Sequence, residues 1–386
     1  MTRCSKKFDC LLLRICLLAL AGMATLVIGY SDLAFFTRTG IASLLGTGSL
    51  VALAFGDRRT LLCFLAISAL ALGWWLLMPP SNDRNWQPDV ALLPWGEIRE
   101  NRVTLHNIRN CDYRSETDYT VRHYDKTYDL ARLKSVDLFL VHWGSPYIAH
   151  TMLSFAFEGE GNVCISIETR RRIGQGYSTL KGLFRQFEVT YVVADERDLI
   201  GLRTNYRHEQ VYLYPLKTTE DFARKVFLNY LWKINSLRER PEWYNALTGN
   251  CTTGMRGRTA PYNPDGSFDW RIIVNGYLDE MLYQRGRIDT SLPFPELKKR
   301  SLINQRAQGW DKSPDFSRLI RSGLPGQRPR PEAGAKLAPG SKEPEGAPGT
   351  SGRGAQETPP PDCPETFVLL KNGSTPSLLV HPAEAS

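Results

Sequence analysis

The sequence predicts an α+β protein that begins with N-terminal transmembrane helices, and three observations support this fold class. The first eighty or so residues are strongly apolar, the middle alternates strand-like and helix-like patterns, and the end is rich in Pro and Gly. Such shifts in composition mark domain boundaries. We therefore expect a membrane anchor at 1–80, an extracytoplasmic domain at 81–322 and a disordered tail at 323–386.

Three apolar runs make up the predicted anchor, at 10–30, 39–55 and 60–78. Each is close to the roughly 20 residues that a helix needs to cross a bilayer. The second run is short and contains Gly46 and Gly48, so it extends best by including residues 33–36. A secretory signal peptide is the competing interpretation of the first run, because basic residues precede it. Two more runs in quick succession favour an anchor of three spans.

Basic residues set the predicted orientation of these spans. Arg3, Lys6 and Lys7 precede the first run, and Arg58 and Arg59 lie between the second and third. Because cytoplasmic loops carry an excess of Lys and Arg, these residues mark the cytoplasmic side. Three crossings then place the chain after residue 78 outside the cytoplasm. We expect a multi-pass protein of a bacterial inner membrane with its main domain in the periplasm.

Alternating patterns predict an antiparallel sheet in the middle of the chain. Residues 150–157 and 163–168 flank a turn at 159–162 and read as a hairpin. Because strand side chains alternate, His150, Met152 and Ser154 share the less apolar face. The remaining strand candidates are 103–109, 136–143, 190–194 and 210–216, and a helix is predicted at 219–237. Its aromatic residues recur at helical spacing and indicate core packing.

Charge and cysteine spacing exclude several classes of function. The net charge of +8 is scattered and comes with no nucleic-acid motif, so we expect no nucleic-acid partner and favour anionic lipid or simply a basic surface. The eight cysteines contain no CxxC pair and no metal-ligand spacing. We therefore expect no metal and no cofactor. Cys111 and Cys164 are either a disulfide or two buried free thiols.

One cysteine stands out as a candidate nucleophile. Cys251 directly follows Asn250, a residue type that caps helices, and His150 lies upstream as the candidate base. A helix N-terminus and a nearby imidazole both lower the pKa of a thiol, and the thiolate is the reactive form. Gly254 and Gly257 weaken any helix that follows Cys251. His142 is the reserve candidate for the base.

Several motifs occur in an order that resembles the Lnb N-terminal periplasmic domain family. They are Arg109-Asn110, Ile148-Ala149-His150-Thr151, Ile165 to Arg170, Arg203-Thr204-Asn205, Pro241 to Asn245 and Asn250-Cys251-Thr252-Thr253. The resemblance covers roughly residues 100–260. It implies a circularly permuted papain-like fold, related to NlpC-type peptidases, in which the histidine precedes the cysteine. Cys111 stands where the family tends to have an aromatic residue.

The remaining site residues follow from the predicted hairpin and from chemistry. Glu168 ends the neighbouring hairpin strand, so it is the candidate for orienting the imidazole, although it could instead form ion pairs with the arginines after it. The backbone N–H of Cys251, with Asn250 or Tyr244, is the candidate oxyanion hole. Arg170 is a further candidate for positioning.

Three functions are compatible with these residues. Some Lnb proteins are taken to be lipoprotein N-acyltransferases, so the resemblance implies acyl transfer from a membrane phospholipid through a Cys251 thioester to a lipoprotein amine. A cell-wall cysteine amidase or peptidase acting on peptidoglycan would use the same residues with water as acceptor. A binding module of the envelope would use none of them. Sequence alone does not separate the first two, because the acceptor depends on the shape of the pocket.

Overall fold

The computed structural model describes residues 3–262 and 267–327, and its first part contains three helices long and apolar enough to cross a membrane. They are α1 (Arg3–Gly29), α2 (Phe35–Phe55) and α3 (Arg58–Leu77). Helix α2 begins at Phe35 and not at residue 39, so the second apolar run is extended toward residues 33–36 as the sequence predicts. Most of the predicted tail, from residue 328 onward, lies outside the described residues.

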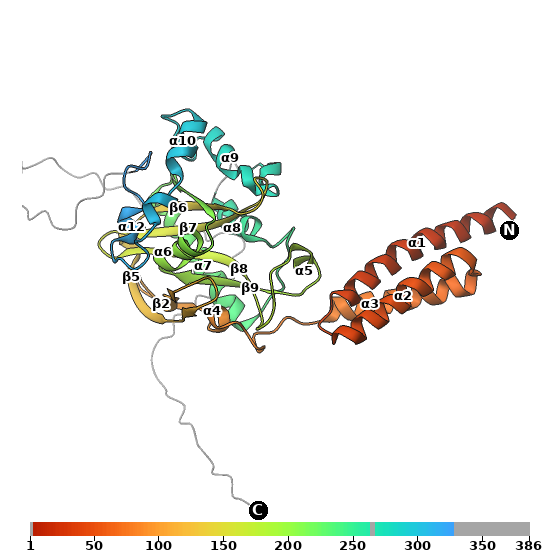
Figure 1. The fold of residues 1–386 in the computed structure, drawn as a ribbon. Coiled ribbons are helices and arrows are strands. Elements are labelled where there is room, and N and C mark those ends of the chain that lie inside the picture. The colour runs from red at the N-terminus through yellow and green to blue at the C-terminus, as the bar shows by residue number, and fades with distance from the viewer. Residues whose placement is uncertain (1–2, 263–266, 328–386) are drawn as a thin grey trace, which may run out of the picture. The chain divides into compact units, whose positions relative to one another are not determined.

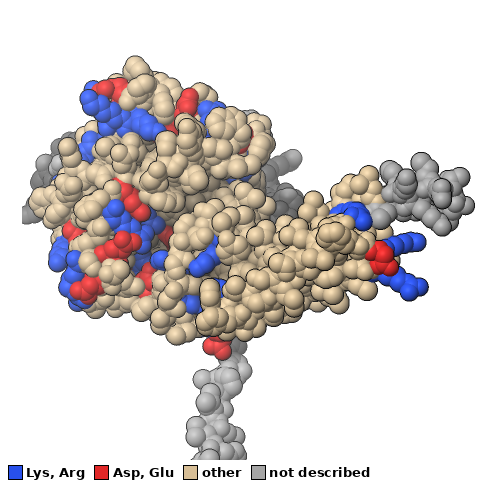
Figure 2. Space-filling model, turned by 45° about the vertical axis from the view of Figure 1, so that its right-hand side comes forward, with Lys and Arg blue, Asp and Glu red and all other residues tan. Residues whose placement is uncertain are grey.

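Small and aliphatic side chains hold the three helices together. Leu17 of α1, Ala52 of α2 and Leu61 of α3 are buried in a common cluster. A side chain at Gly48 would meet the Phe64 ring at 2.8 Å, so glycine allows α2 and α3 to approach closely. Figure 2 shows the outer surface of these helices as largely uncharged, as expected for contact with lipid chains.

An eight-stranded sheet forms the centre of the domain that follows (Figure 1). Its order is β1-β2-β9-β8-β7-β6-β10, with β5 paired to β2, and its pairs are antiparallel apart from a single parallel bridge between β2 and β9. The strands are β1 (Trp95–Arg99), β2 (Arg102–Arg109), β5 (His123–Asp129), β6 (Leu133–His142), β7 (Ala149–Phe157), β8 (Gly161–Arg170), β9 (Glu188–Ala194) and β10 (Gln210–Pro215). A separate pair joins β3 (Asp112–Tyr113) to β4 (Tyr119–Thr120). The predicted antiparallel sheet and α+β class are confirmed.

Helices cover both faces of this sheet. One face packs against α7 (Glu220–Glu239) and α8 (Cys251–Thr259), and the other packs against α6 (Glu196–Gly201), α11 (Asn304–Ala307) and α12 (Phe316–Leu319). The shorter helical segments are α4 (Pro88–Ala91), η1 (Leu130–Arg132), α5 (Thr179–Leu183), the π-helix η2 (Leu202–Tyr206), η3 (Ala260–Tyr262), η4 (Trp270–Ile272), η5 (Asn275–Tyr277), α9 (Leu278–Gln284) and α10 (Phe294–Ser301). The apolar stripe of α7 lies in the core, as its spacing predicts.

The hairpin of β7 and β8 opens at one end. Its ladder begins at Phe157 opposite Gly161 and stops at Met152 opposite Ser166. Beyond that point β7 continues along β6, and β8 continues along β9. The next positions would pair His150 with Glu168. These two residues therefore lie where the strands separate, and they meet through their side chains.

A linker ties the end of α3 to the domain. The indole Nε1 of Trp243 donates to the carbonyl of Met78 at 3.1 Å, one residue after α3 ends. The Asn82 amide donates to the carbonyls of Leu237 and Arg238 at the end of α7, both at 2.9 Å. The domain is thus attached within a few residues of α3, the last candidate membrane span.

The structure decides between the two interpretations of Cys111 and Cys164. Both side chains are buried, and both thiols are free. Cys164 lies in the core on the α6 face of the sheet, whereas Cys111 packs with Tyr113 and Leu202. They are the two buried free thiols of the second interpretation.

Candidate active site

Helix α8 begins at Cys251 and is capped by the residue before it. The Asn250 side chain accepts from the backbone N–H groups of Thr252 and Thr253 at 3.0 and 2.9 Å, and Thr253 Oγ1 accepts from the Asn250 N–H. This reciprocal capping box stabilises a helix start by about 1 kcal/mol. Asn250 is therefore the helix cap that the sequence suggests.

The two glycines do not prevent this helix from forming. A side chain at Gly254 would meet the Ile167 side chain of β8 at 2.9 Å. Glycine thus lets α8 pack on the sheet without moving the end of the Ile167 side chain, and this tertiary packing outweighs its weak helix propensity. The expectation that Gly254 and Gly257 weaken the helix was incomplete, because it counted the propensity and not the packing.

Cys251 lies against the start of β7, next to His150. Its side chain is 8% exposed, and Sγ is 4.0 Å from the carbonyl oxygen of Ala149. Burial alone would raise the pKa of the thiol, but the charge and hydrogen bond of His150 outweigh burial and lower it from 9.0 to about 7. The predicted nucleophile and base therefore meet, although 101 positions separate them in the sequence.

His150 is in turn held by two residues of β8. Its Nε2 is 2.7 Å from Ser166 Oγ and 3.2 Å from Glu168 Oε1, and Ser166 also donates to Glu168 at 2.7 Å. Burial opposes the charged imidazole, but Glu168 and Cys251 favour it and raise the pKa of His150 to about 9. Between pH 7 and 9 the pair is a thiolate and an imidazolium.

Arg203 completes this arrangement and was given no role from the sequence. Its Nη2 donates to Glu168 Oε1 at 2.7 Å, and its side chain is 5% exposed. Burial would raise the pKa of Glu168, but His150 and Arg203 hold it well below its usual range. Arg203 lies in the π-helix η2, a rare element that often marks functional sites. Its place in the quoted Arg203-Thr204-Asn205 motif was the only signal available.

Asn275 joins the two halves of the site and was also missed. Its Oδ1 accepts from the Ala149 N–H at 2.8 Å, and its Nδ2 donates to the Ala149 carbonyl and to Thr252 Oγ1, both at 2.6 Å. These bonds link the residue before His150 to the residue after Cys251. The side chain is 4% exposed. Asn275 therefore bridges the segments that carry the candidate base and the candidate nucleophile.

The residue after Asn275 explains how this bridge comes so close to β7. A side chain at Gly276 would lie 2.0 Å from the carbonyl oxygen of Pro146, so only glycine fits there. The Gly276 N–H also donates to the Tyr147 carbonyl at 3.0 Å. The Asn-Gly pair at 275–276 is the sequence signal for this close backbone approach.

Tyr244 lies beside the candidate nucleophile. Its side chain is buried, and burial followed by the charges of Cys251, Tyr177 and Glu168 raises the pKa of its phenol. It stays a neutral hydrogen-bond donor at physiological pH. The Asn250 amide, by contrast, is occupied: besides capping α8 it donates to the Ala246 carbonyl at 3.0 Å.

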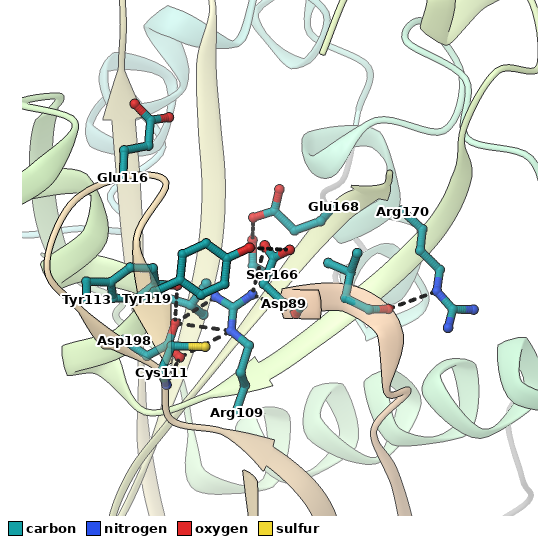
Figure 3. A network of polar contacts seen from close by, with 12 residues as sticks. Asp89, Arg109, Cys111, Tyr113, Glu116, Tyr119, Ser166, Glu168, Arg170 and Asp198 are labelled. Atoms are coloured by element: carbon teal, nitrogen blue, oxygen red, sulfur yellow. Dashed lines mark hydrogen bonds and ion pairs between the residues drawn. The ribbon is translucent and has the colours of Figure 1, made fainter. Parts of the chain in front are cut away.

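Arg170 is directed to the linker instead of to the site. It donates to the carbonyls of Val90 and Ala91 and to Asn82 Oδ1, at 2.8 to 3.0 Å, and it stacks on the Trp86 ring. Figure 3 shows it bonded to the linker and separate from Glu168 and Ser166. Its position near the end of β8, beside the linker, is the reason. The structure assigns it to holding the linker.

His142, the reserve candidate for the base, packs against other residues than His150 does. It pairs with Ala149 across the β6–β7 ladder, and burial and the charge of Lys298 lower its pKa. Its ring packs edge-on against Tyr212 of β10. Of the two histidines, the structure brings His150 to Cys251.

A second buried polar network lies on the same side of the sheet as Glu168 (Figure 3). Arg109 Nη2 donates to Asp198 Oδ1 at 2.6 Å, and the backbone N–H of Cys111 donates to Asp198 Oδ2 at 2.6 Å. Burial and the charge of Asp198 raise the pKa of the Cys111 thiol to about 12. This cysteine is therefore a protonated core residue.

Within residues 3–262 and 267–327, no group of three His, Cys, Asp or Glu side chains is placed to hold a metal ion.

Three membrane-length helices and an α+β domain with a buried cysteine–histidine pair define a membrane-anchored protein with a candidate thiol site. Residues 119–276 match the family model of the Lnb N-terminal periplasmic domain, and this part of the chain belongs to that family. Searches of curated proteins and of solved structures gave no match.

The family match fits the location of the site. The matched range contains Cys251, His150, Glu168, Arg203 and Asn275, and so every residue of the arrangement described above. Together with the three candidate spans, it identifies a membrane-anchored periplasmic protein associated with the cell envelope. The predicted family is confirmed, and the papain-like permutation stays a prediction.

Proposed function

We propose that this protein is a periplasmic thiol acyltransferase of the bacterial inner membrane, anchored by three spans. It moves an acyl chain from a membrane phospholipid through a Cys251 thioester to an amine, such as the N-terminus of a lipoprotein. The observation that carries this proposal is the arrangement of Cys251, His150 and Glu168 at the start of α8. The short connection to α3 keeps that site beside its lipid substrate.

The first half of the reaction forms the thioester. The Cys251 thiolate attacks the ester carbonyl of the phospholipid, and a C–S bond forms. The tetrahedral intermediate then collapses, the C–O bond to the glycerol breaks, and the imidazolium of His150 gives its proton to the departing alkoxide. A lysophospholipid leaves, and neutral His150 remains beside the acyl-enzyme.

The second half transfers the chain. The amine of the acceptor attacks the thioester carbonyl and passes its proton to His150, the C–S bond breaks, and an amide forms. This step regenerates the thiolate and the imidazolium. Because Nε2 of His150 is held by Ser166 and Glu168, Nδ1 is the nitrogen that exchanges protons with sulfur and substrate.

Two donors suit the oxyanion of each tetrahedral intermediate. The backbone N–H of Cys251 occupies the first turn of α8, where helix donors have no partner within the helix and the dipole favours negative charge. The phenol of Tyr244 is the second donor. Asn250 acts through the cap, because it fixes the direction of these N–H groups.

The test uses the full chain reconstituted in liposomes with defined phospholipids. Mass spectrometry of the intact wild-type protein should show one added acyl chain on Cys251, and Cys251→Ser should abolish the labile thioester. Cys111→Ser is the matched control, because it removes another buried thiol and should leave the adduct in place. Absence of an adduct with every lipid tested would contradict the proposal.

The acceptor is tested by adding a diacylated lipopeptide to the same liposomes. Loss of the thioester with formation of an N-acylated peptide supports acyl transfer. Release of free fatty acid at the same rate with and without the peptide would instead support a hydrolase. Cleavage of a peptidoglycan fragment without a lipid adduct would support the cell-wall amidase.

A further inference from the structure

Four large apolar side chains are exposed on two segments that contact each other. Ile173, Tyr177 and Leu180 belong to the chain before and within α5, and Leu247 belongs to the loop that leads to Cys251. Each is between 47% and 59% exposed. The two segments are joined by a hydrogen bond from the Ala246 N–H to the Gly182 carbonyl at 3.3 Å. We refer to these four residues as the α5 patch.

The α5 patch begins where the chain leaves the last membrane helix. The Ile173 N–H donates to the carbonyl of Asn85 in the linker at 2.9 Å, and Trp86 bridges to Arg172. The linker also contacts the segment that leads to Leu247, because Trp243, four residues before it, donates to the carbonyl of Met78. Chain connectivity therefore keeps both segments of the patch close to the end of α3, which is also the surface of the bilayer.

The same segment carries contacts typical of a membrane interface. The Arg185 guanidinium stacks on the Trp75 ring at 4.7 Å and donates to the carbonyls of Trp75 and Leu76 in the last turn of α3. Trp side chains are enriched at the level of lipid headgroups, and nearby cations attract anionic lipid. Lys181 within α5 adds a second cation. An apolar surface flanked by cations is typical of segments that lie in the interface.

The α5 patch is also connected to the candidate nucleophile. Tyr177 and Cys251 are both among the neighbours whose charges raise the pKa of the buried Tyr244 phenol. Gly182 packs on the Tyr244 ring, where an added side chain would come within 3.2 Å. Leu247 precedes Cys251 by four residues. A lipid chain in contact with the patch is therefore next to the segments that form the site.

We propose that the α5 patch inserts into the periplasmic leaflet of the phospholipid bilayer and delivers acyl chains from it to Cys251. The occupant of the patch is the leaflet itself, because the patch adjoins the emerging helix, exposes aliphatic and aromatic side chains, and is flanked by Lys181 and Arg185. The delivery role rests on the proposed acyl transfer. The contact with lipid does not depend on it.

The contact is tested with the full chain in nanodiscs of phosphatidylethanolamine and phosphatidylglycerol. A photo-crosslinking p-benzoylphenylalanine replaces Leu180, Leu247 or, as the matched control, Trp310, which is 48% exposed beside α11. We expect phospholipid adducts at Leu180 and Leu247, at least tenfold above those at Trp310. Equal yields at all three positions, crosslinks to protein in place of lipid, or no adduct at the two patch positions would overturn the proposal.

Delivery is tested with the double variant Leu180→Ser and Leu247→Ser. It should form the Cys251 thioester from nanodisc lipid about tenfold more slowly, because less apolar surface enters the leaflet. Alkylation of Cys251 by iodoacetamide should keep the wild-type rate, since this small reagent needs no bilayer. An unchanged rate of thioester formation would overturn delivery. A wild type without any thioester would refute acyl transfer, and the crosslinks would still decide the contact.

Discussion

Two buried cysteines of this domain lie near carboxylates that are paired with arginines, yet their chemistry differs. Cys251 lies beside His150, and its pKa is lowered to about 7. Cys111 lies beside Asp198, and burial together with the charge of that carboxylate raises the pKa of its thiol to about 12. A carboxylate in direct contact opposes the thiolate, whereas a carboxylate that acts through an imidazole supports it. The histidine between acid and sulfur accounts for the opposite directions of the two pKa shifts.

The largest expected effect follows from removing that histidine. His150→Ala leaves Cys251 with burial and no opposing charge, so the thiol pKa should rise above 9.0. Acyl transfer should fall about 1,000-fold, because both the thiolate and the acid–base group are lost. Iodoacetamide labelling of Cys251 across pH 6 to 10 measures the shift. A labelling midpoint that stays near 7 would show that His150 does not activate the thiol.

Glu168→Gln should reduce the difference in thiol pKa between Cys251 and Cys111 without abolishing it. The change removes the charge that most favours the imidazolium, so the pKa of His150 should fall from about 9 toward 6.5. The pair is active where Cys251 has lost its proton, above pH 7, and His150 still carries one, below pH 9. A lower pKa of His150 should therefore move the upper limit of this pH range downward. Activity at pH 8 should fall about 100-fold. A pH–rate profile with an unchanged alkaline limb would contradict this role.

Asn275→Ala tests whether the bridge between β7 and α8 positions the pair. Loss of its three hydrogen bonds should lower acyl transfer about tenfold or more and raise the pH midpoint of Cys251 labelling, because the imidazole and sulfur are no longer held together. Asn235→Ala is the matched control: Asn235 makes the same two-point bridge to the backbone of Gly96, between α7 and β1. If both variants leave the labelling midpoint unchanged, Asn275 serves only stability.

The smallest effect on acyl transfer is expected from substitution of Cys111. Cys111→Ala removes a small buried side chain, so it should lower stability by about 1 kcal/mol and leave acyl transfer within twofold of the wild type. Chemical denaturation and the thioester assay measure the two quantities. A loss of activity comparable to that of Cys251→Ser would place Cys111 in the reaction and remove the contrast between the two thiols.

The candidate nucleophile, base and carboxylate could be predicted from the sequence because local patterns point to them. Asn250 and Cys251 show a helix start, and the hairpin register places His150 opposite Glu168. Arg203 and Asn275 could not be assigned in this way, since they reach the site only through the packing of η2 and η5 against the sheet. The bonds of Arg170 to Val90 could not be foreseen either, because strand alternation gives a face of the sheet but not the neighbour that covers it.

Gly254 and Gly257 of α8 also show that local sequence patterns do not reveal tertiary packing. A propensity scale counts Gly254 as a cost to the helix, and that cost is real for an isolated peptide. In the folded domain, Gly254 packs on the end of the Ile167 side chain, which would have to move to admit a larger residue, whereas Gly257 meets no neighbour within 4 Å. Sequence patterns predict elements, but the reason for a small residue often lies in a surface that only the fold creates.

The bond between Trp243 and the carbonyl of Met78 has a kinetic consequence. A domain fixed so close to its last candidate span does not exchange with the periplasmic solution, so it would meet the lipid substrate proposed above by lateral diffusion in two dimensions. Its rate should then follow the mole fraction of substrate in the surface. Adding inert lipid to the same vesicles should slow the reaction, while diluting those vesicles in buffer should leave the turnover per protein unchanged.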